Sequence, residues 1–564
     1  MDYKLLVAQS LHDVLKDQLE LNEINQLLEK PKMVEHGDLA FPTFQLAKLF
    51  RKNPAQIAAE LQDQVSSPII EKVQTVGPYL NFFLKKDQVS QLVLKEILEQ
   101  KELYGAVNIG NGQNVPIDMS SPNIAKPMSM GHLRSTVIGN ALSNILSRVG
   151  YNPVRINYLG DWGTQFGKLI SAYKKWGTEE DVRANPIKEL LRLYVLFHEE
   201  AEKHPELEDE GRAWFKKLED GNEEAIALWT WFREESLAEF QKVYDRLNIQ
   251  FDSYKGEAFY NDKMDSVVSL LDKKNLLTLN QGAHIVDLEK YNLNPALIRK
   301  SDGATLYMTR DLAAALYRKE NYDFSQALYV VGQEQSNHFK QLKGVLSEMG
   351  YDWAENIHHI PFGLITKDGK KLSTRKGKVV LLEEVLNEAS SLALQQIEDK
   401  NPSLENKEVV AEQVGVGAVV FHDLKNDRLN NFDFTIEEVV QFEGETGPYV
   451  QYTRARGLSI LKKAEKESFS TSENYSLNDS YSWEVIKLIQ EFPETLIRAY
   501  KQYEPSIIAK HSIHLSQAFN KFYANVRVLD EHPEKESRLA LVYAVTELLK
   551  QDLTILGVET PDKM

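Results

Sequence analysis

The chain has 564 residues, no cysteine and a formal net charge of −17 at pH 7. This length exceeds what one hydrophobic core organises, so roughly two to four domains are expected. The lack of cysteine excludes disulfides and thiolate metal sites, and the negative charge argues against nucleic-acid binding through a generally basic surface. No apolar run approaches the ~18 residues of a membrane span, and MDYKLLVAQSL lacks the pattern of a secretory signal. We therefore expect a cytoplasmic protein, not bound to membranes, that contacts any nucleic acid through local basic patches.

Residues 1–112 combine helical periodicity with a strand-like run. Apolar residues recur at helical spacing in LLVAQSLHDVLKDQL and FQLAKLFRKNPAQIAAELQ, whereas YLNFFL is typical of a strand. The turn-rich VNIGNGQN ends the segment. This mixture predicts a small α+β domain.

The next forty or so residues have the order strand, loop, helix, strand. VPIDM and PVRINYL are short apolar runs, and LRSTVIGNALSNILSRVG between them carries its apolar residues on one helical face. This order builds a parallel sheet, so residues 113–384 are expected to form an α/β domain. The connecting loop SSPNIAKPMSMGHLRST should lie where a strand end meets a helix N-terminus, a position that suits a phosphate. Because it has neither GxGxxG nor GxxxxGK, it is not a dinucleotide fingerprint or a P-loop.

Helical and strand-like segments then follow in blocks. Residues 171–260 are charged and helical in period, which predicts a helical insertion into the α/β domain. AHIVDL, ATLYMT, ALYVVG and HHIPFGLI predict further strands of the same sheet. Residues 385–564 are almost wholly helical in pattern and predict an all-α bundle.

A basic cluster lies near the end of the predicted α/β domain. Between Lys367 and Lys378 there are six positive charges and one carboxylate, that of Asp368. On an acidic chain this cluster indicates either a loop that binds a polyanion or a solvated loop.

The two polar clusters together resemble the HIGH and KMSKS signatures of class I aminoacyl-tRNA synthetases. Residues 129–132 (SMGH) stand at the first signature and residues 371–375 (KLSTR) at the second. Further segments resemble the arginyl-tRNA synthetase family in order and spacing over nearly the whole chain: SPNIAKPMSMGHLRS, NYLGDWGTQFG, DGATLYMTRDLAAALYR, VVGQEQSNHFKQL and EGETGPYVQYTRAR. The resemblance implies a multidomain protein with a Rossmann-like catalytic domain, an N-terminal α+β domain that contacts tRNA and a helical anticodon-binding domain.

The reaction that the resemblance implies is arginine–tRNA ligation. Arginine and ATP, with Mg²⁺, give arginyl-adenylate and pyrophosphate, and tRNA(Arg) then accepts arginine on its terminal ribose. No organic cofactor and no protein-bound metal are expected, and the family is usually monomeric. Charge develops on phosphate oxygens in this chemistry, so fixed donors are needed rather than a nucleophilic side chain. The donors that match the family by position are Lys126, His132 and Lys371.

The resemblance also implies a set of ATP contacts: Ser129, Gly131, His132, His338, Lys371 and Ser373. Two positions depart from the class pattern. Ser129 replaces the first histidine of HIGH, and Thr374 replaces the second lysine of KMSKS. In arginyl enzymes with the second departure, the lysine upstream of HIGH is thought to compensate, and Lys126 stands at that position. Without the family, His132 could equally be a buried structural histidine.

Five positions match the family's arginine pocket: Asp118, Asn123, Tyr307, Asp311 and Gln335. A guanidinium presents five donors in a planar fork, so a selective pocket needs a carboxylate and neutral acceptors. By this resemblance, Asp311 is the guanidinium carboxylate and Tyr307 closes the pocket. The other three match positions that hold the substrate's α-amino group, carboxylate or guanidinium. Without the family, Asp311 could instead pair with Arg310 or Arg318.

Three residues of the helical region are candidates for tRNA contact: Tyr449, Tyr452 and Arg456, which share one helical face. Splayed bases stack on such planar groups, although each tyrosine could instead belong to the bundle core. Two other functions stay open, a class I synthetase for another amino acid and a catalytically silent tRNA-binding protein. Ser129 alone favours the silent protein, whereas intact Lys126, His132 and Lys371 favour an enzyme.

Overall fold

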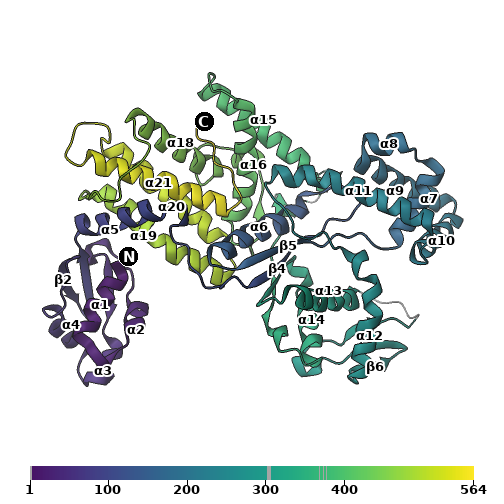
Figure 1. Ribbon diagram of the computed structural model, residues 1–564, viewed down its shortest axis with the longest axis horizontal. Coiled ribbons are helices and arrows are strands. Elements are labelled where there is room, and N and C mark those ends of the chain that lie inside the picture. Colours follow the sequence, from purple (N-terminus) through teal and green to yellow (C-terminus); the bar gives the residue numbers. More distant parts are fainter. Residues whose placement is uncertain (1–2, 302–306, 368, 373, 376–377) are drawn as a thin grey trace.

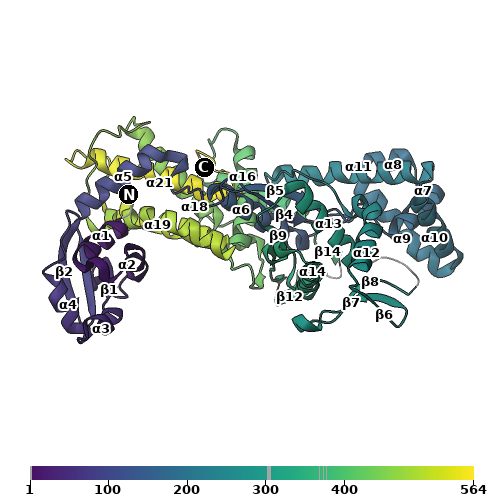
Figure 2. The same ribbon diagram turned by 60° about the horizontal axis from the view of Figure 1, so that its bottom comes forward.

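The computed structural model describes residues 3–301, 307–367, 369–372, 374–375 and 378–564. The described chain is elongated (Figures 1 and 2). A small N-terminal domain lies at one end of the long axis, and a group of helices lies at the other. Between them a parallel sheet packs against a C-terminal helical bundle. No described helix is long and apolar enough to cross a membrane.

The N-terminal domain is α+β, as predicted. Its antiparallel sheet has the order β1-β3-β2 and consists of β1 (Leu39–Pro42), β2 (Ile70–Val76) and β3 (Tyr79–Leu84). Its helices are α1 (Tyr3–Leu15), α2 (Leu21–Leu27), α3 (Phe44–Phe50) and α4 (Pro54–Gln62). Helix α5 (Lys86–Gln100) leaves this domain and packs on the C-terminal bundle. There the Ser90 hydroxyl accepts a hydrogen bond from the Leu477 amide at 2.9 Å.

The central sheet is wholly parallel, with the strand order β10-β9-β4-β5. Its strands are β4 (Asn114–Ser120), β5 (Asn152–Asn157), β9 (Ala327–Val330) and β10 (Ile357–Ile360). Helix α6 (Leu133–Arg148) connects β4 to β5, and the chain later returns to β9 on the other side of β4. The strand order therefore reverses at β4, and the crevice beyond the carboxyl end of that strand is where such sheets bind ligands.

The predicted helical insertion follows β5 and forms the far end of the molecule (Figure 1). It consists of α7 (Thr164–Trp176), α8 (Glu179–Ala184), α9 (Pro186–Lys203), α10 (Glu206–Glu219) and α11 (Glu223–Arg246). Buried aromatic side chains such as Phe197 and Phe232 join these helices to the main core. The arm is therefore packed onto the domain rather than tethered to it.

Two of the predicted sheet strands are wrong. The strand in AHIVDL belongs to a separate antiparallel sheet of β6 (Leu277–Asn280), β7 (Ala283–Val286) and β8 (Ala296–Arg299). Residues 307–309 of ATLYMT begin helix α13 (Tyr307–Tyr322). The helix forms because Met308, Leu312 and Ala315 recur at helical spacing and are buried on one face. Helices α12 (Met264–Lys273) and α14 (Ser336–Glu348) pack against α13.

The basic cluster lies on short strands beside the sheet. Strand β11 (Ile365–Lys367) pairs with β12 (Lys370–Lys371) and with β15 (Phe432–Asp433), while β13 (Thr374–Arg375) pairs with β14 (Lys378–Val379). The C-terminal helices then follow: α15 (Leu382–Lys400), α16 (Lys407–Lys425), α17 (Ile436–Val439), α18 (Gly447–Lys463), α19 (Ser480–Gln502), α20 (Ser506–Asn525) and α21 (Lys535–Ile555).

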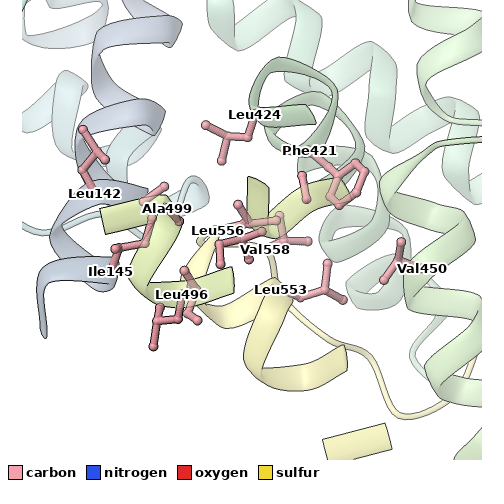
Figure 3. Packing of buried hydrophobic residues seen from close by; sticks show 14 of the residues in the cluster. Leu142, Ile145, Phe421, Leu424, Val450, Leu496, Ala499, Leu553, Leu556 and Val558 are labelled. Atoms are coloured by element: carbon pink, nitrogen blue, oxygen red, sulfur yellow. The ribbon is translucent and has the colours of Figure 1, made fainter. Parts of the chain in front are cut away.

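Helix α6 shares its apolar core with this bundle. Figure 3 shows Leu142 and Ile145 of α6 in one cluster with side chains of α16, α19 and the end of α21. Polar contacts reinforce both ends of α6. At the first turn, Arg134 forms a buried ion pair with Asp423 of α16, with Nε and Oδ2 3.3 Å apart. At the last residue, Arg148 donates to the Gln551 side chain of α21 at 2.6 Å.

Replacing Asp423 should destabilise the fold strongly. Asp423→Ala leaves the Arg134 guanidinium buried without its counter-ion, a loss of about 3–5 kcal/mol. Lys510→Ala is the matched control, because it removes an ion pair to Asp427 whose partners are each 50% exposed and should cost about 0–1 kcal/mol. Chemical and thermal unfolding followed by circular dichroism would compare the two. Equal stability of both variants would contradict a structural role for the buried pair.

Candidate active site

The signature loop, residues 121–132, lies at the carboxyl ends of β4 and β5. Its backbone is hydrogen-bonded to the segment after β5: the Ile124 amide donates to the Gly160 carbonyl at 3.2 Å, and the Gly160 amide donates to the Pro122 carbonyl at 3.0 Å. The approach is close enough to need glycine, since a Cβ at residue 160 would lie 2.2 Å from Oδ1 of Asn123. The predicted arginine contact Asn123 is thus exposed at the crevice of the parallel sheet.

His132 ends the short 3-10 turn Met130–His132 that leads directly into α6. The Ser129 amide donates to Nδ1 of His132 at 3.0 Å, so Nδ1 is the acceptor and the neutral ring carries its proton on Nε2. Burial lowers the pKa of His132, which favours this neutral form. Its side chain is half-buried rather than enclosed in the core. The ring can therefore present an N–H donor beside a helix N-terminus.

The segment after the basic cluster holds this same turn. The Met130 amide donates to the Val380 carbonyl, and the Leu382 amide donates to the Met128 carbonyl, both at 3.0 Å. Ser129 and Leu381 thereby form an antiparallel bridge. Two segments about 250 residues apart in sequence thus meet at the predicted ATP site.

Two predicted ATP contacts fall at the edge of what is described. Lys371 ends β12, where its backbone pairs with Thr366 of β11. The Lys371 side chain and the whole of Ser373 lie outside the described residues. Gly131, in the 3-10 turn, is exposed, and so is the side chain of Lys126. The Lys126 ammonium lies 5.4 Å from the ring centre of Tyr194 in α9.

Asp311 of α13 lies in a polar cluster beyond the carboxyl end of the sheet. The Tyr158 hydroxyl donates to its carboxylate at 3.1 Å, and Nε2 of His338 lies 2.6 Å from its other oxygen. His338, which we predicted as an ATP contact, is thus paired with the predicted guanidinium carboxylate. Among the residues that the structure describes, neither Arg310 nor Arg318 forms an ion pair with Asp311.

Asp118 has a partner within the protein. Its carboxylate is buried and pairs with the buried Arg318 guanidinium at 2.9 Å. Burial raises the pKa of Asp118, and the adjacent Arg318 opposes that shift. Because Arg318 neutralises its charge, the Asp118 carboxylate attracts a cationic ligand less strongly than the Asp311 carboxylate does. The other predicted contacts, Tyr307 and Gln335, are exposed at the starts of α13 and α14.

Glu257 is a further acidic residue near Asp311 that the sequence analysis missed. It lies in the turn after the helical insertion, with a carboxylate oxygen 3.8 Å from Arg310. Burial raises its pKa to about 7, an effect that Arg310 opposes and that Asp161 and Asp311 reinforce. Nothing in KGEAFYND marks this glutamate, because its neighbours come from segments far away in sequence. A buried carboxyl group whose pKa is strongly raised beside charged neighbours is a candidate functional residue.

The predicted tRNA contacts share a network on α18. Asn520 of α20 donates to the Tyr449 hydroxyl at 3.0 Å and accepts from Arg456 at 2.7 Å, while the Arg456 guanidinium lies 5.1 Å from the Tyr452 ring centre. All three side chains are half-buried, so neither tyrosine is enclosed in the core. Tyr452 and Arg456 line an open cleft whose cationic side chains outnumber its acidic ones and include Lys462, Lys463, Lys550 and Lys563.

Three family models of known proteins match successive parts of the chain. The family model for the class I (R) tRNA synthetase catalytic domain matches residues 93–436. The DALR anticodon binding domain matches residues 450–564, and the arginyl tRNA synthetase N-terminal domain matches residues 1–84.

Similar proteins match over their full length. Arginine–tRNA ligases of Enterococcus faecalis and Ligilactobacillus salivarius are 68% and 62% identical to this chain, over 100% of each protein. The solved arginyl-tRNA synthetase of Thermus thermophilus has a TM-score of 0.81 at 25% identity and 100% coverage of both chains. That of Plasmodium falciparum has a TM-score of 0.80 at 25% identity, covering 100% of this chain and 98% of its own. The chain therefore belongs to the arginyl-tRNA synthetase family of class I enzymes.

Proposed function

We infer that this chain is an arginine–tRNA ligase. It converts arginine and ATP to arginyl-adenylate and pyrophosphate, and then transfers arginine to the 3′-terminal ribose of tRNA(Arg). One observation carries the assignment beyond family membership. The turn that bears His132 is hydrogen-bonded to the segment after the basic cluster, at the same edge of the parallel sheet as the acidic cluster around Asp311. A phosphate site and a guanidinium site therefore lie in one crevice.

The phosphate half of the site supplies donors without a nucleophile. The arginine carboxylate attacks the α-phosphorus of MgATP, and negative charge shifts onto phosphate oxygens while pyrophosphate leaves. Neutral His132 donates from Nε2, at the turn that leads into the N-terminus of α6, where the helix dipole favours negative charge. The ammonium groups of Lys126 and Lys371 add positive charge, and Mg²⁺ enters as part of the substrate. The Ser129 amide and hydroxyl both contact Nδ1 of His132, so Ser129 contributes by orienting that ring.

The arginine half of the site depends on Asp311. His338 and Tyr158 both contact its carboxylate and so fix the plane in which a guanidinium can form paired hydrogen bonds. Glu257 adds a second carboxylate when it is ionised. Asn123, Tyr307 and Gln335 lie at the exposed rim. A lysine ammonium would leave such fork-shaped acceptors unpaired, so the pocket should discriminate strongly against lysine.

The bundle and the N-terminal domain supply the tRNA surface in this proposal. Tyr452 and Arg456 open into the cationic cleft at α18, which suits stacked bases and phosphates. Residues 1–112 contact the tRNA, residues 113–384 activate the amino acid and residues 385–564 bind the anticodon. Every part of the reaction is carried by one chain, so a monomer is sufficient for activity.

Pyrophosphate exchange should depend on arginine, on tRNA and on His132. We expect labelled pyrophosphate to enter ATP only when arginine and tRNA(Arg) are present, and His132→Ala to slow exchange by about 10²–10³-fold, as for loss of one oxyanion donor. His532→Ala, on an exposed loop of the bundle, is the control and should match the unaltered protein. Binding of tRNA without exchange by any amino acid would instead identify a silent tRNA-binding protein.

The KM for arginine should rise as the pH falls below about 7. Burial holds the pKa of Glu257 near that value, so this group is charged and attracts the guanidinium above pH 7 and becomes neutral below it. Steady-state aminoacylation over a pH series measures the effect.

Glu257→Gln supplies the matched test of this pH dependence. The variant should have a raised KM for arginine in the alkaline range and little further change as the pH falls. A KM that varies with pH equally in both proteins would exclude Glu257 as its cause.

A further inference from the structure

The loop that carries Lys126 is hydrogen-bonded to the helical insertion. The Ala125 amide donates to Oγ of Ser236 in α11 at 2.9 Å, and Ser236 is fully buried. The Ser236 hydroxyl in turn donates to the Phe232 carbonyl at 2.7 Å. The hydroxyl proton of Ser236 is therefore donated within α11. Its oxygen is left to accept the hydrogen bond from the loop.

Ala125 needs such an acceptor because of its backbone. Its φ is +62°, in the left-handed region that side-chain-bearing residues seldom adopt. A conformation of this kind persists only where the surroundings enforce it. Since Lys126 is the next residue, the conformation of Ala125 determines the direction in which the Lys126 side chain leaves the loop.

A second contact reaches Lys126 itself. Its ammonium lies 5.4 Å from the ring centre of Tyr194 in α9, and helices α9 and α11 pack against each other. The attraction of a cation to an exposed aromatic face is weak. The ring can therefore restrict the flexible side chain and still release the ammonium to a phosphate.

We propose that Ser236 and Tyr194 are positioning residues for Lys126 in the formation of arginyl-adenylate. Ser236 fixes the backbone from which Lys126 projects, and Tyr194 limits where its ammonium lies. The helical insertion thereby acts on the chemistry through one loop. This inference rests on the proposed role of Lys126 as a phosphate donor, because no other charged side chain of the loop lies between Ser120 and His132.

A double-mutant cycle on the full-length chain tests the proposal. Arginine- and tRNA-dependent pyrophosphate exchange is measured for Ser236→Ala, Lys126→Met and the double variant. We expect Lys126→Met to lower kcat by about 10²-fold and Ser236→Ala to lower it by about 10-fold, with the KM for arginine unchanged. The double variant should be no slower than Lys126→Met alone, since Ser236 acts through that lysine.

Three outcomes would overturn the proposal, and they are distinguishable. Full activity of Ser236→Ala beside a slow Lys126→Met removes only the positioning role. Losses that multiply in the double variant show that Ser236 acts by another route. Full activity of Lys126→Met overturns the donor role of Lys126 and the positioning role with it. It does not affect the arginine–tRNA ligase assignment, which the His132→Ala experiment tests separately.

Two controls separate positioning from folding. Ser516→Ala removes another fully buried hydroxyl, one that makes no hydrogen bond in the described part of the chain, and it should leave kcat and the unfolding temperature unchanged. Should Ser236→Ala fold poorly, the half-buried Tyr194 gives the same test: Tyr194→Phe keeps the ring and should keep kcat, whereas Tyr194→Leu should lower kcat severalfold, but not in the Lys126→Met background. Equal rates for the two Tyr194 variants would exclude a role for the ring.

Discussion

Helix α6 is held on two sides, and this restraint fixes the position of His132, the proposed hydrogen-bond donor to phosphate. On one side it lies so close to the sheet that a Cβ at Gly139 would be 2.1 Å from Cβ of Met119 in β4. On the other side it shares an apolar core with the bundle (Figure 3). The buried Arg134–Asp423 pair and Arg148 reinforce this contact. Close-packed interiors transmit displacement rather than absorb it. The turn bearing His132 therefore has a fixed place relative to both the sheet and the bundle.

The site separates two kinds of charge that the reaction must keep apart. In the proposed site, the neutral imidazole of His132 and the exposed side chain of Lys126 on the signature loop serve the place where phosphate charge develops. Around Asp311, the proposed guanidinium site, the buried Arg318 compensates the charge of Asp118, so the acidic groups do not all repel one another. The same logic operates at the surface, because a chain of net charge −17 still presents a cationic cleft at α18. Local arrangement, not net charge, decides which partner each surface attracts.

The sequence alone was sufficient to predict features that depend on contiguous residues. The signature loop, the basic cluster and the periodicity of the helices predicted the domain architecture and identified the family before any contact was known. It was insufficient where residues meet only in three dimensions. ATLYMT has the composition of a strand, but the burial of Met308, Leu312 and Ala315 on one side makes its end a helix. Glu257 and Ser236 lie in segments without a recognisable motif, and their roles come from neighbours about 50 to 110 residues away.

The pairing of His338 with Asp311 shows why even matched residues need a structure. The resemblance predicted both as site residues, His338 as an ATP contact and Asp311 as an arginine contact, and the 2.6 Å contact between them links these two predicted groups. A histidine bound to a carboxylate is oriented by it, as in other catalytic pairs where the partner fixes a tautomer. Position in a motif thus indicates that a residue belongs to the site, whereas its role follows from what it touches.

The signature loop is connected to the bundle, to the helical insertion and to the segment after the basic cluster. Helix α6 connects it to the bundle, Ser236 connects it to the insertion, and residues 380–382 connect it to the basic cluster. The last two connections, and the one to Gly160, are hydrogen bonds to the loop's own main chain. A shift of any one neighbour must therefore either carry the loop along or leave a backbone group unpaired at a cost of about 1–3 kcal/mol. That cost is comparable to a tenfold or hundredfold change in rate. Small displacements of any neighbouring segment can therefore change the rate of the reaction at the loop.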